Sequence, residues 1–343
     1  VNRMEQGEDP MTTALVTGGG GFLGSDVIDL LLEKGWTVRS YSRSLYPSLQ
    51  KQGVQCLQGD LTDAAAVAKA CDGVDVVFHV PAKAGMCGPY EDYYQANVVG
   101  TKNVITACQQ AGVSKLVYTS SPSVVFDGSD MEGVDESVPY PDHYESHYPK
   151  TKAEAEKAVL AVNSEKLLTC SLRPHLIWGP GDNHLIPRIV DRARKGQLRI
   201  IGDGKNKVDT VFVENAALAH LQAAEKLAAQ SPVAGKAYFI TNDEPKILWD
   251  IINDILKAAG EKPITRHVPK FVAYGAGWIF ETVYGLFGIE SEPRMTRWVA
   301  SELTTNHWFD ISAAKNDFGY EPKISMAEGM KKLADWFANQ RNN

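Results

Sequence analysis

The sequence contains few cysteines, and they form no pattern that would bind a metal or build a disulfide framework. Its 343 residues include five, with no CxxC pair: Cys56, Cys71, Cys87, Cys108 and Cys170. An odd number without close pairs argues against a disulfide-stapled scaffold and a zinc site, and fits a reducing compartment. We therefore expect a cytoplasmic protein.

Positive charge is also scarce. Lys and Arg number 35 against 42 Asp and Glu, which gives a formal net charge of −7, and no basic run occurs. Such a chain lacks the electrostatic footprint of a nucleic-acid-binding protein, so no nucleic-acid partner is expected. An anionic ligand must instead be held locally, by backbone amides or a few basic side chains.

The chain also lacks a signal-peptide pattern and a long uninterrupted apolar run. Residues 1–10 are polar and acidic, and we expect Met11 to be the natural start. The most apolar stretch, residues 271–289, approaches the roughly 20 residues of a spanning helix, but it carries Glu281 and four glycines. We expect a helix that packs into a second lobe, with a peripheral segment at a membrane interface as the alternative.

What the chain does contain is an alternation of short apolar runs with helical patterns. The runs that predict strands are 14–17, 37–41, 54–57, 74–80, 115–120 and 168–177, and helical spacing occurs at 22–33, 63–71, 93–111 and 148–163. Strands that are apolar throughout and alternate with helices predict a parallel sheet covered on both faces. The predicted fold is therefore α/β, with a doubly wound parallel Rossmann sheet.

The length predicts two lobes rather than one core. Residues 11–180 and 208–245 are assigned to the dinucleotide-binding Rossmann domain, because 208–245 still reads as sheet-domain elements. Glycine and proline at 179–181 break the pattern. Residues 181–207 and 246–343 are assigned to a smaller, mostly helical substrate-binding lobe.

A glycine cluster follows the first predicted strand: Thr17-Gly18-Gly19-Gly20-Gly21-Phe22-Leu23-Gly24. Two registers fit, GxGxxG from Gly19 and GxxGxxG from Gly18. In either one, glycines make the tight turn, let a pyrophosphate approach the backbone and let the helix pack on the strand. Since the helix N-terminus offers free N–H groups to phosphates, the loop predicts a dinucleotide site.

The end of the second predicted strand indicates which dinucleotide binds. An acid there would bond the ribose of NAD, whereas Ser42 and Arg43 offer a hydroxyl and a guanidinium, with Arg39 nearby. We therefore expect NADP(H), with Arg43 and Arg39 clamping the 2′-phosphate. Asp60, after the third strand, is expected to touch the adenine; its alternative role, capping the next helix, suits Asp63 equally well.

A tyrosine and a lysine at helical spacing carry the predicted chemistry. Tyr148 and Lys152 share a helix face, and Pro149 is tolerated only in a first turn, with Ser146 as the N-cap. A neighbouring ammonium is expected to lower the pKa of the Tyr148 phenol towards neutrality. Such a phenol donates a proton to a carbonyl oxygen while hydride arrives from a nicotinamide.

With these motifs the chain resembles the extended short-chain dehydrogenases/reductases, and within them the 3β-hydroxysteroid dehydrogenase/isomerase branch. The segments that carry the resemblance are TGGGGFLG, QGDLTD, ANVVGTKNVI, LVYTSSPSVVF, YPKTKAEAEKAVL and LRPHLIWGPGD. The resemblance implies a catalytic serine at Ser121, with Ser120 as the alternative, and the acid/base pair at Tyr148 and Lys152. It also implies that Lys152 holds the nicotinamide ribose and that members pair through helices 93–111 and 148–163.

The residues expected to contact the dinucleotide combine the motifs with this resemblance. They are Gly18, Gly21, Phe22, Leu23, Gly24, Ser42, Arg43, Asp60, Leu61, Ala82, Lys152, Pro174 and Ile177.

Further segments, among them HLIPRIVDRARKGQLRIIGDGKNKVDT and GKAYFITNDEP, resemble the 2-alkyl-3-ketoalkanoate reductases of bacterial long-chain olefin biosynthesis. That resemblance implies reduction of a β-keto acid with two alkyl chains to the β-hydroxy acid, a homodimer, and an assembly with other enzymes of the pathway. The side chains considered for an apolar pocket are Trp178, Phe271, Trp278, Phe280, Tyr284 and Phe287. Candidate donors to a substrate carboxylate are Lys83, His147, Arg188 and Lys207.

The sequence leaves three other functions open. The first is a 3β-hydroxysteroid or sterol-4-carboxylate 3-dehydrogenase, whose substrate would be sterol-like. The second is a non-catalytic dinucleotide sensor, which the presence of both Tyr148 and Lys152 disfavours. The third is an NAD-dependent sugar-nucleotide epimerase, which the missing acid after the second strand disfavours.

Overall fold

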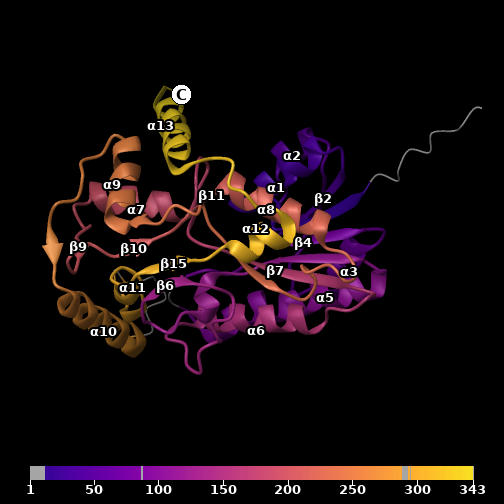
Figure 1. The fold of residues 1–343 in the computed structure, drawn as a ribbon, viewed down its shortest axis with the longest axis horizontal. Helices are drawn as coiled ribbons and strands as arrows, with labels where there is room; N and C mark the ends of the chain where they lie inside the picture. Colours follow the sequence, from indigo (N-terminus) through magenta and orange to yellow (C-terminus); the bar gives the residue numbers. More distant parts are fainter. Residues whose placement is uncertain (1–11, 86–87, 288–292, 294, 343) are drawn as a thin grey trace, which may run out of the picture.

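A computed structural model describes residues 12–85, 88–287, 293 and 295–342, and its centre is a parallel sheet of seven strands (Figure 1). The order across the sheet is β12-β7-β5-β4-β1-β2-β3, and every neighbouring pair is parallel. The strands are β1 (Thr13–Thr17), β2 (Thr37–Ser42), β3 (Gln55–Gln58), β4 (Val76–His79), β5 (Lys115–Thr119), β7 (Leu168–Pro174) and β12 (Ala237–Ile240). The order reverses between β1 and β4, and ligands of such sheets bind at the carboxyl ends of the strands beside this point.

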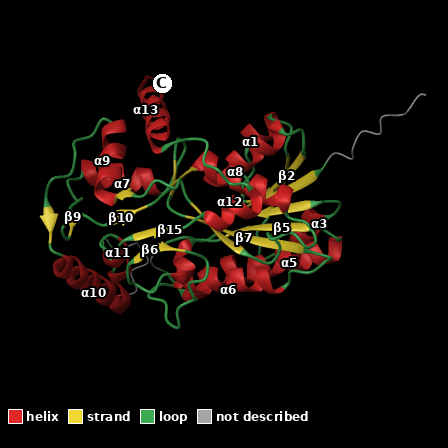
Figure 2. Cartoon of the chain, viewed as in Figure 1, coloured by secondary structure: helices red, strands yellow, loops and turns green. Residues whose placement is uncertain are grey.

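Helices cover both faces of the sheet, which confirms the predicted doubly wound Rossmann fold (Figure 2). The first face carries α1 (Phe22–Glu33), α8 (Val213–Lys226) and α12 (Ser312–Phe318), and the second carries α3 (Ala64–Cys71), α5 (Gly100–Ala111) and α6 (His147–Ala161). On α1, Val27 and Leu31 are fully buried, and each such side chain contributes about 1.5–3 kcal/mol by leaving water. The short helices α2 (Pro47–Lys51), α4 (Tyr90–Tyr93) and the 3₁₀ helix η2 (Pro122–Val125) lie in the connections.

The helix predicted over 93–111 differs from the structure in its first part. It begins with a π-helix, η1 (Tyr94–Val99), which continues into α5. Within η1, the Asn97 side chain makes two bonds with the backbone of Lys83. Its oxygen accepts from the Lys83 N–H at 2.7 Å, and its amide group donates to the Lys83 carbonyl at 3.1 Å. Asn97 thereby fixes the segment that follows β4, at the edge where ligands of this fold bind.

A smaller lobe is built on a four-stranded sheet in the order β13-β10-β15-β6. Its strands are β6 (Met131–Val134), β10 (Lys207–Val208), β13 (Lys246–Ile247) and β15 (His307–Phe309), and two short pairs join β8 (Ile177–Trp178) to β11 (Val211–Phe212) and β9 (Ile200–Ile201) to β14 (His267–Val268). The remaining helices are α7 (Leu185–Arg194), α9 (Leu248–Ala258), α10 (Lys270–Phe287), α11 (Arg297–Glu302) and α13 (Met326–Asn342). A separate apolar core, which includes Trp249 and Ile252 of α9, fills this lobe.

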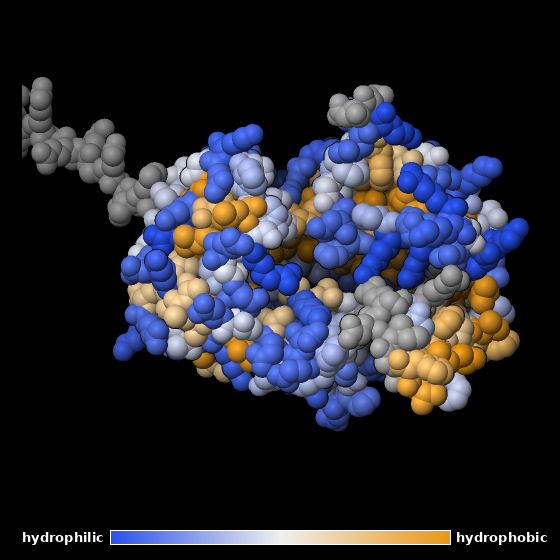
Figure 3. Space-filling view, turned by 180° about the vertical axis from the view of Figure 1, so that it is seen from behind, coloured by the Kyte–Doolittle hydropathy of each residue, from blue (hydrophilic) through white to orange (hydrophobic). Residues whose placement is uncertain are grey.

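Helix α10 covers most of the apolar stretch at 271–289, of which residues 288 and 289 lie outside the described part. One side packs as expected, since Ala273 is buried and Gly277 lies against the backbone of Thr296. The other side is exposed and forms an apolar patch on the surface (Figure 3): Phe271, Val272, Tyr274, Trp278, Ile279, Val283, Leu286 and Phe287. None of the described helices combines the length and the apolar character that crossing a membrane requires.

Candidate active site

A cavity of about 1300 Å³ opens at the carboxyl ends of the sheet strands and extends to the smaller lobe. Pockets for one small molecule typically measure about 300–1,000 Å³, so this volume has room for a dinucleotide and a second ligand. Every residue predicted to contact the dinucleotide lines it: Gly18, Gly21, Phe22, Leu23, Gly24, Ser42, Arg43, Asp60, Leu61, Ala82, Lys152, Pro174 and Ile177. Ser121 and Tyr148 line the same cavity.

The glycine loop makes a tight turn that fits a pyrophosphate. Gly18 has a φ of 72°, and its carbonyl accepts from the Gly21 N–H at 2.9 Å. A Cβ on Gly24 would lie 2.3 Å from that carbonyl oxygen, so only glycine permits this approach of helix and strand. Since no side chain caps the start of α1, its first N–H groups remain available to an anion. Gly18, Gly21 and Gly24 line the cavity, which supports the GxxGxxG register.

The two arginines on and after β2 have different surroundings. Arg43 follows the strand, lines the cavity and is exposed. Arg39 points elsewhere: its Nε donates to Gln55 at 2.8 Å, and its Nη1 donates to the carbonyl oxygens of Ala70 and Asp72 at 3.0 and 2.5 Å. The prediction that Arg39 helps to clamp a phosphate is therefore wrong, because the guanidinium is held at the carboxyl end of α3.

Asp63, and not Asp60, takes the helix-capping role that the sequence left open. Asp63 is the N-cap of α3 and accepts from the Ala66 N–H at 3.0 Å. Asp60 lines the cavity, and its carboxylate accepts from the N–H and hydroxyl of Thr62 at 2.8 and 2.7 Å. These bonds lower the pKa of Asp60, so it presents a charged carboxylate, oriented by Thr62, to the cavity.

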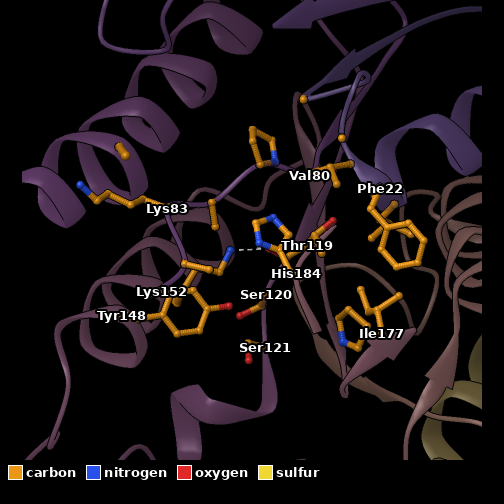
Figure 4. Close-up of a pocket in the computed structure, with 18 of the residues that line it drawn as sticks. Phe22, Val80, Lys83, Thr119, Ser120, Ser121, Tyr148, Lys152, Ile177 and His184 are labelled. Atoms are coloured by element: carbon orange, nitrogen blue, oxygen red, sulfur yellow. Dashed lines mark hydrogen bonds between the residues drawn. The ribbon is translucent and has the colours of Figure 1, made fainter. Parts of the chain in front are cut away.

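Tyr148, Ser120 and Ser121 lie together at the wall of the cavity (Figure 4). Helix α6 begins one residue before Tyr148, after Ser146, which occupies the N-cap position without a side-chain capping bond. Ser121 ends the connection from β5, where its hydroxyl lies 2.9 Å from that of Ser123 and also interacts with the Tyr148 phenol. Ser120 also lines the cavity, and the interaction of Ser121 with the Tyr148 phenol favours Ser121 as the second hydroxyl at a carbonyl.

Lys152 lies one turn further along α6 and is almost fully buried. Its Nζ donates to the Thr119 carbonyl at 2.5 Å and stands 4.1 Å from the ring centre of Tyr118 (Figure 4). Burial lowers the pKa of Lys152 to about 7, while the Glu156 carboxylate acts in the opposite direction. The ammonium group is thus fixed at the cavity wall by the end of β5.

The predicted effect of Lys152 on Tyr148 is not found. Burial raises the pKa of Tyr148 above its ordinary value, and the bond with Ser121 offsets this only in part. The expectation of a depressed pKa is wrong because the Lys152 ammonium is directed at Thr119 and Tyr118 instead. The phenol is therefore fully protonated at neutral pH, which is the form that can donate to a ketone oxygen.

A buried ionic network holds α6 against β7. Glu156 pairs with Arg173 at 2.7 Å, and both side chains are at most 3% exposed. The Glu156 carboxylate also accepts from the hydroxyls of Tyr140 and Ser171, each at 2.7 Å. Since Glu156 is one turn beyond Lys152, the network fixes the helix that carries both Tyr148 and Lys152.

The apolar end of the cavity is formed by residues that the sequence did not single out: Phe126, Met131, Leu176, Leu185, Trp298 and Phe309. The aromatic residues considered for this role lie elsewhere. Trp178 is fully buried and packs edge-on against Phe212, whereas Phe271, Trp278 and Phe287 are exposed on α10. Phe280 and Tyr284 pack against each other on the same helix, away from the cavity-lining residues.

Of the four candidate donors to a substrate carboxylate, only Lys83 lines the cavity. Its Nζ is paired with Asp92 at 2.7 Å. His147 packs against the rings of Tyr90 and Tyr93, and Arg188 and Lys207 do not line the cavity. Sequence reasoning instead missed His175, Glu302 and His307, which line the apolar end. The one available signal was the position of His175, directly after the end of β7.

Comparison with known proteins places this site in a family. A sequence model of the 3-beta hydroxysteroid dehydrogenase/isomerase family matches residues 15–269. The chain belongs to that family. A 2-alkyl-3-oxoalkanoate reductase of Stenotrophomonas maltophilia is 48% identical, over 93% of this chain and 97% of the relative. The sterol-4-alpha-carboxylate 3-dehydrogenase (decarboxylating) of Mus musculus is 36% identical, over 96% of this chain and 91% of the relative.

Among solved structures, that of gox2253 superposes with a TM-score of 0.78 at 28% identity, over 96% of this chain and 98% of the other. The family match, the fold and the geometry of the glycine loop all indicate an enzyme that binds a dinucleotide. The protein is an oxidoreductase that uses a nicotinamide dinucleotide.

Proposed function

We propose that this protein reduces the ketone of a 2-alkyl-3-oxoalkanoate to the alcohol with NADPH, as a step of long-chain olefin biosynthesis. The observation that carries the proposal is the 48% identity, over nearly the whole of both chains, to a 2-alkyl-3-oxoalkanoate reductase. The site is compatible with it, since an apolar region able to hold alkyl chains adjoins Tyr148 and Ser121 in one cavity.

The residues of the chain divide the work of reduction among them. The glycine loop and the start of α1 would hold the pyrophosphate, and Lys152 the nicotinamide ribose; the bound dinucleotide supplies a hydride. Ser121 donates a hydrogen bond to the ketone oxygen and orients it. Tyr148 donates the phenolic proton to that oxygen as the alcohol forms, and its raised pKa keeps the proton in place until then.

The preference for NADPH is proposed from the surroundings of Arg43. No carboxylate ends β2 to bond a ribose 2′-hydroxyl, and the exposed Arg43 side chain lines the cavity, where its guanidinium would pair with a 2′-phosphate. Arg43→Ala is expected to raise the KM for NADPH about tenfold or more and to leave the KM for NADH within about twofold. Initial rates with both dinucleotides measure this, with Arg39→Ala as the matched arginine that does not face the cavity. Equal changes for NADPH and NADH in Arg43→Ala would contradict the assignment.

A second candidate is oxidation of a 3β-hydroxysteroid 4-carboxylate. The 36% identity to the sterol-4-alpha-carboxylate 3-dehydrogenase favours it, and both proposed substrates carry oxygen two carbons from a carboxylate carbon. The deciding assay compares kcat/KM for reduction of a 2-alkyl-3-oxoalkanoate with NADPH and for oxidation of the steroid acid with NAD. We expect reduction of the keto acid to be at least tenfold faster. Faster turnover of the steroid would overturn the choice.

A further inference from the structure

Helix α10 gathers the exposed apolar side chains of the described residues in one place. Of the nine large apolar side chains that are exposed there, eight lie on this helix, and the ninth is Leu45. The eight form the apolar patch of α10, seen as the orange area at the lower right of Figure 3. Phe271, Trp278 and Leu286 are 76%, 57% and 78% exposed. The proposed reduction uses none of them, so the patch needs another explanation.

The patch occupies one face of the helix, and that face is free of charge. With about 3.6 residues in each turn, Phe271, Trp278 and Leu286 lie along the same side. Thr282 is on this side too, but its hydroxyl donates to the Trp278 carbonyl at 2.8 Å, so the helix itself satisfies it. The only acid of α10 is Glu281, which is half-buried and turned towards α11.

The opposite side of α10 is fixed to the smaller lobe. A Cβ on Gly277 would lie 2.6 Å from the carbonyl carbon of Thr296, so α10 packs directly on the start of α11. Glu281 accepts from the Arg297 N–H at 2.7 Å and from its Nε at 2.6 Å. The next residue of α11, Trp298, lines the apolar end of the cavity. The patch is therefore directed away from the lobe, on a helix whose neighbour forms part of the cavity wall.

The segment that leads into α10 carries positive charge and no negative charge. Between residues 262 and 270 the sequence contains Lys262, Arg266 and Lys270 and no acid. All three are exposed, and none forms an ion pair with a described residue. The preceding acid, Glu261, is paired with Arg194 at 2.7 Å. This segment runs through β14 along the edge of the smaller lobe into the first turn of α10 (Figure 1), so its cations complement an anionic surface beside the patch.

The size and chemistry of the patch favour a lipid surface over a second protein. A helix rises about 1.5 Å per residue and is about 10 Å wide, so one face of these 18 residues covers roughly a few hundred Å². A stable contact between proteins buries about 800 Å² on each partner and needs hydrogen-bonding groups throughout. A lipid surface requires neither, and the aromatic rings of Tyr274 and Trp278 are the kind that favours the boundary between lipid and water.

We propose that α10 attaches this protein to the surface of an anionic phospholipid membrane. The helix lies in the plane of the surface, with the apolar patch among the acyl chains and with Lys262, Arg266 and Lys270 against the phosphate head groups. Attachment brings the apolar end of the cavity close to the lipid, because Trp298 follows the residue that binds α10. A supply of long alkyl substrates from the lipid rests on the proposed function, whereas the attachment itself does not.

Sedimentation with phospholipid vesicles tests the proposal without any reference to catalysis. Wild-type protein is expected to bind vesicles of phosphatidylcholine mixed with phosphatidylglycerol. Phe271→Ser/Trp278→Ser/Leu286→Ser should lower the partition coefficient about tenfold or more, because three apolar side chains no longer leave water. The matched control is Leu45→Ser, which removes the exposed large apolar side chain that lies outside α10 and should change binding less than about twofold.

The cations are tested with the same vesicles. Arg266→Gln/Lys270→Gln should lower binding to the mixed vesicles about tenfold or more and leave the weaker binding to pure phosphatidylcholine within about twofold. Insertion of α10 itself is measured with lipids that carry bromine on the acyl chains. These should quench the tryptophan emission of wild type, whereas Trp278→Phe, which keeps the patch apolar, should still bind and lose most of the quenching.

No described residue of α10 lines the cavity, so all these variants should keep the dissociation constant of NADPH within about twofold, which shows that they are folded. Wild-type protein that ignores the mixed vesicles, a triple variant that binds them as well as wild type, or quenching that persists in Trp278→Phe would each overturn the proposal. A dimer that the triple variant dissociates, in a protein that binds no vesicles, would assign the patch to a contact between copies instead. Vesicle binding without ketone reduction would count against the proposed function alone.

Discussion

Tyr148→Phe is expected to lower kcat for ketone reduction about a thousandfold while NADPH binding stays within about twofold of wild type. A positioned proton donor contributes typically about 10²–10⁴-fold to a rate, and the half-buried Tyr148 phenol beside Ser121 is the proposed donor. Phenylalanine keeps the ring and removes only the proton. Oxidation of NADPH at saturating ketone gives kcat, and quenching of protein fluorescence gives the dissociation constant of NADPH.

Tyr90→Phe is the matched control for this result. Its hydroxyl touches Glu154 at 3.4 Å and does not line the cavity, so kcat should change less than about twofold. A Tyr148→Phe protein that retains more than a tenth of the wild-type kcat would assign proton delivery to another group. A protein that binds NADPH and reduces no ketone even with Tyr148 intact would instead favour a dinucleotide sensor.

Arg173→Met is expected to lower the free energy of unfolding by about 3–5 kcal/mol. The substitution removes the partner of Glu156 and leaves a buried carboxylate supported only by hydroxyl groups such as those of Tyr140 and Ser171. Urea unfolding, compared at constant m-value, measures the loss. In the control Lys195→Met, the exposed pair with Asp191 is broken, and the loss should stay below about 1 kcal/mol.

The double variant Glu156→Leu/Arg173→Met separates the ion pair from the packing. Replacing both partners removes the uncompensated charge, so the double variant should be more stable than Arg173→Met alone. A double variant that is less stable than both single variants would show that the ion pair itself supplies the stability.

The same network predicts a pH dependence. Burial acts to raise the pKa of Glu156, but Arg173 and neighbouring hydroxyls hold it below its ordinary value. In wild type the contribution of this carboxylate is present above pH 4.5 and is lost as the pH falls through its folded pKa. In Arg173→Met, protonation relieves the buried charge, so the deficit relative to wild type should be smaller at pH 5 than at pH 8.

Much of the dinucleotide cradle could be predicted because its causes are local. The turn at Gly18 and the close approach at Gly24 depend on neighbouring residues in the chain. The spacing of Tyr148 and Lys152 on one face follows from helix geometry, and Pro149 restricts them to a first turn. The alternation of buried strands with helices likewise predicts a parallel sheet before any contact is known.

Other features depended on partners that local spacing does not reveal. Arg39 looked like a phosphate ligand beside Arg43, but the carbonyl oxygens at the end of α3, more than 30 residues away, bind its guanidinium. The direction of the Tyr148 pKa shift was reversed because burial, which no four-residue motif encodes, raises the pKa while the Lys152 ammonium is directed at Thr119 instead. The aromatic residues of α10 have the composition of a core, yet only one side of that helix meets the lobe.

The family, the fold class, the glycine loop and the helix that carries Tyr148 and Lys152 could be predicted from the amino-acid sequence. Each follows from short-range geometry or from similarity to known proteins over most of the chain. Which charged side chains are paired and which face the cavity depends instead on contacts between segments far apart in the chain. His175, Glu302 and His307 line the cavity from segments up to 132 residues apart, and none carries a recognisable motif. Their arrangement exists only after folding has joined these segments, because spacing along the chain does not bring such distant residues together.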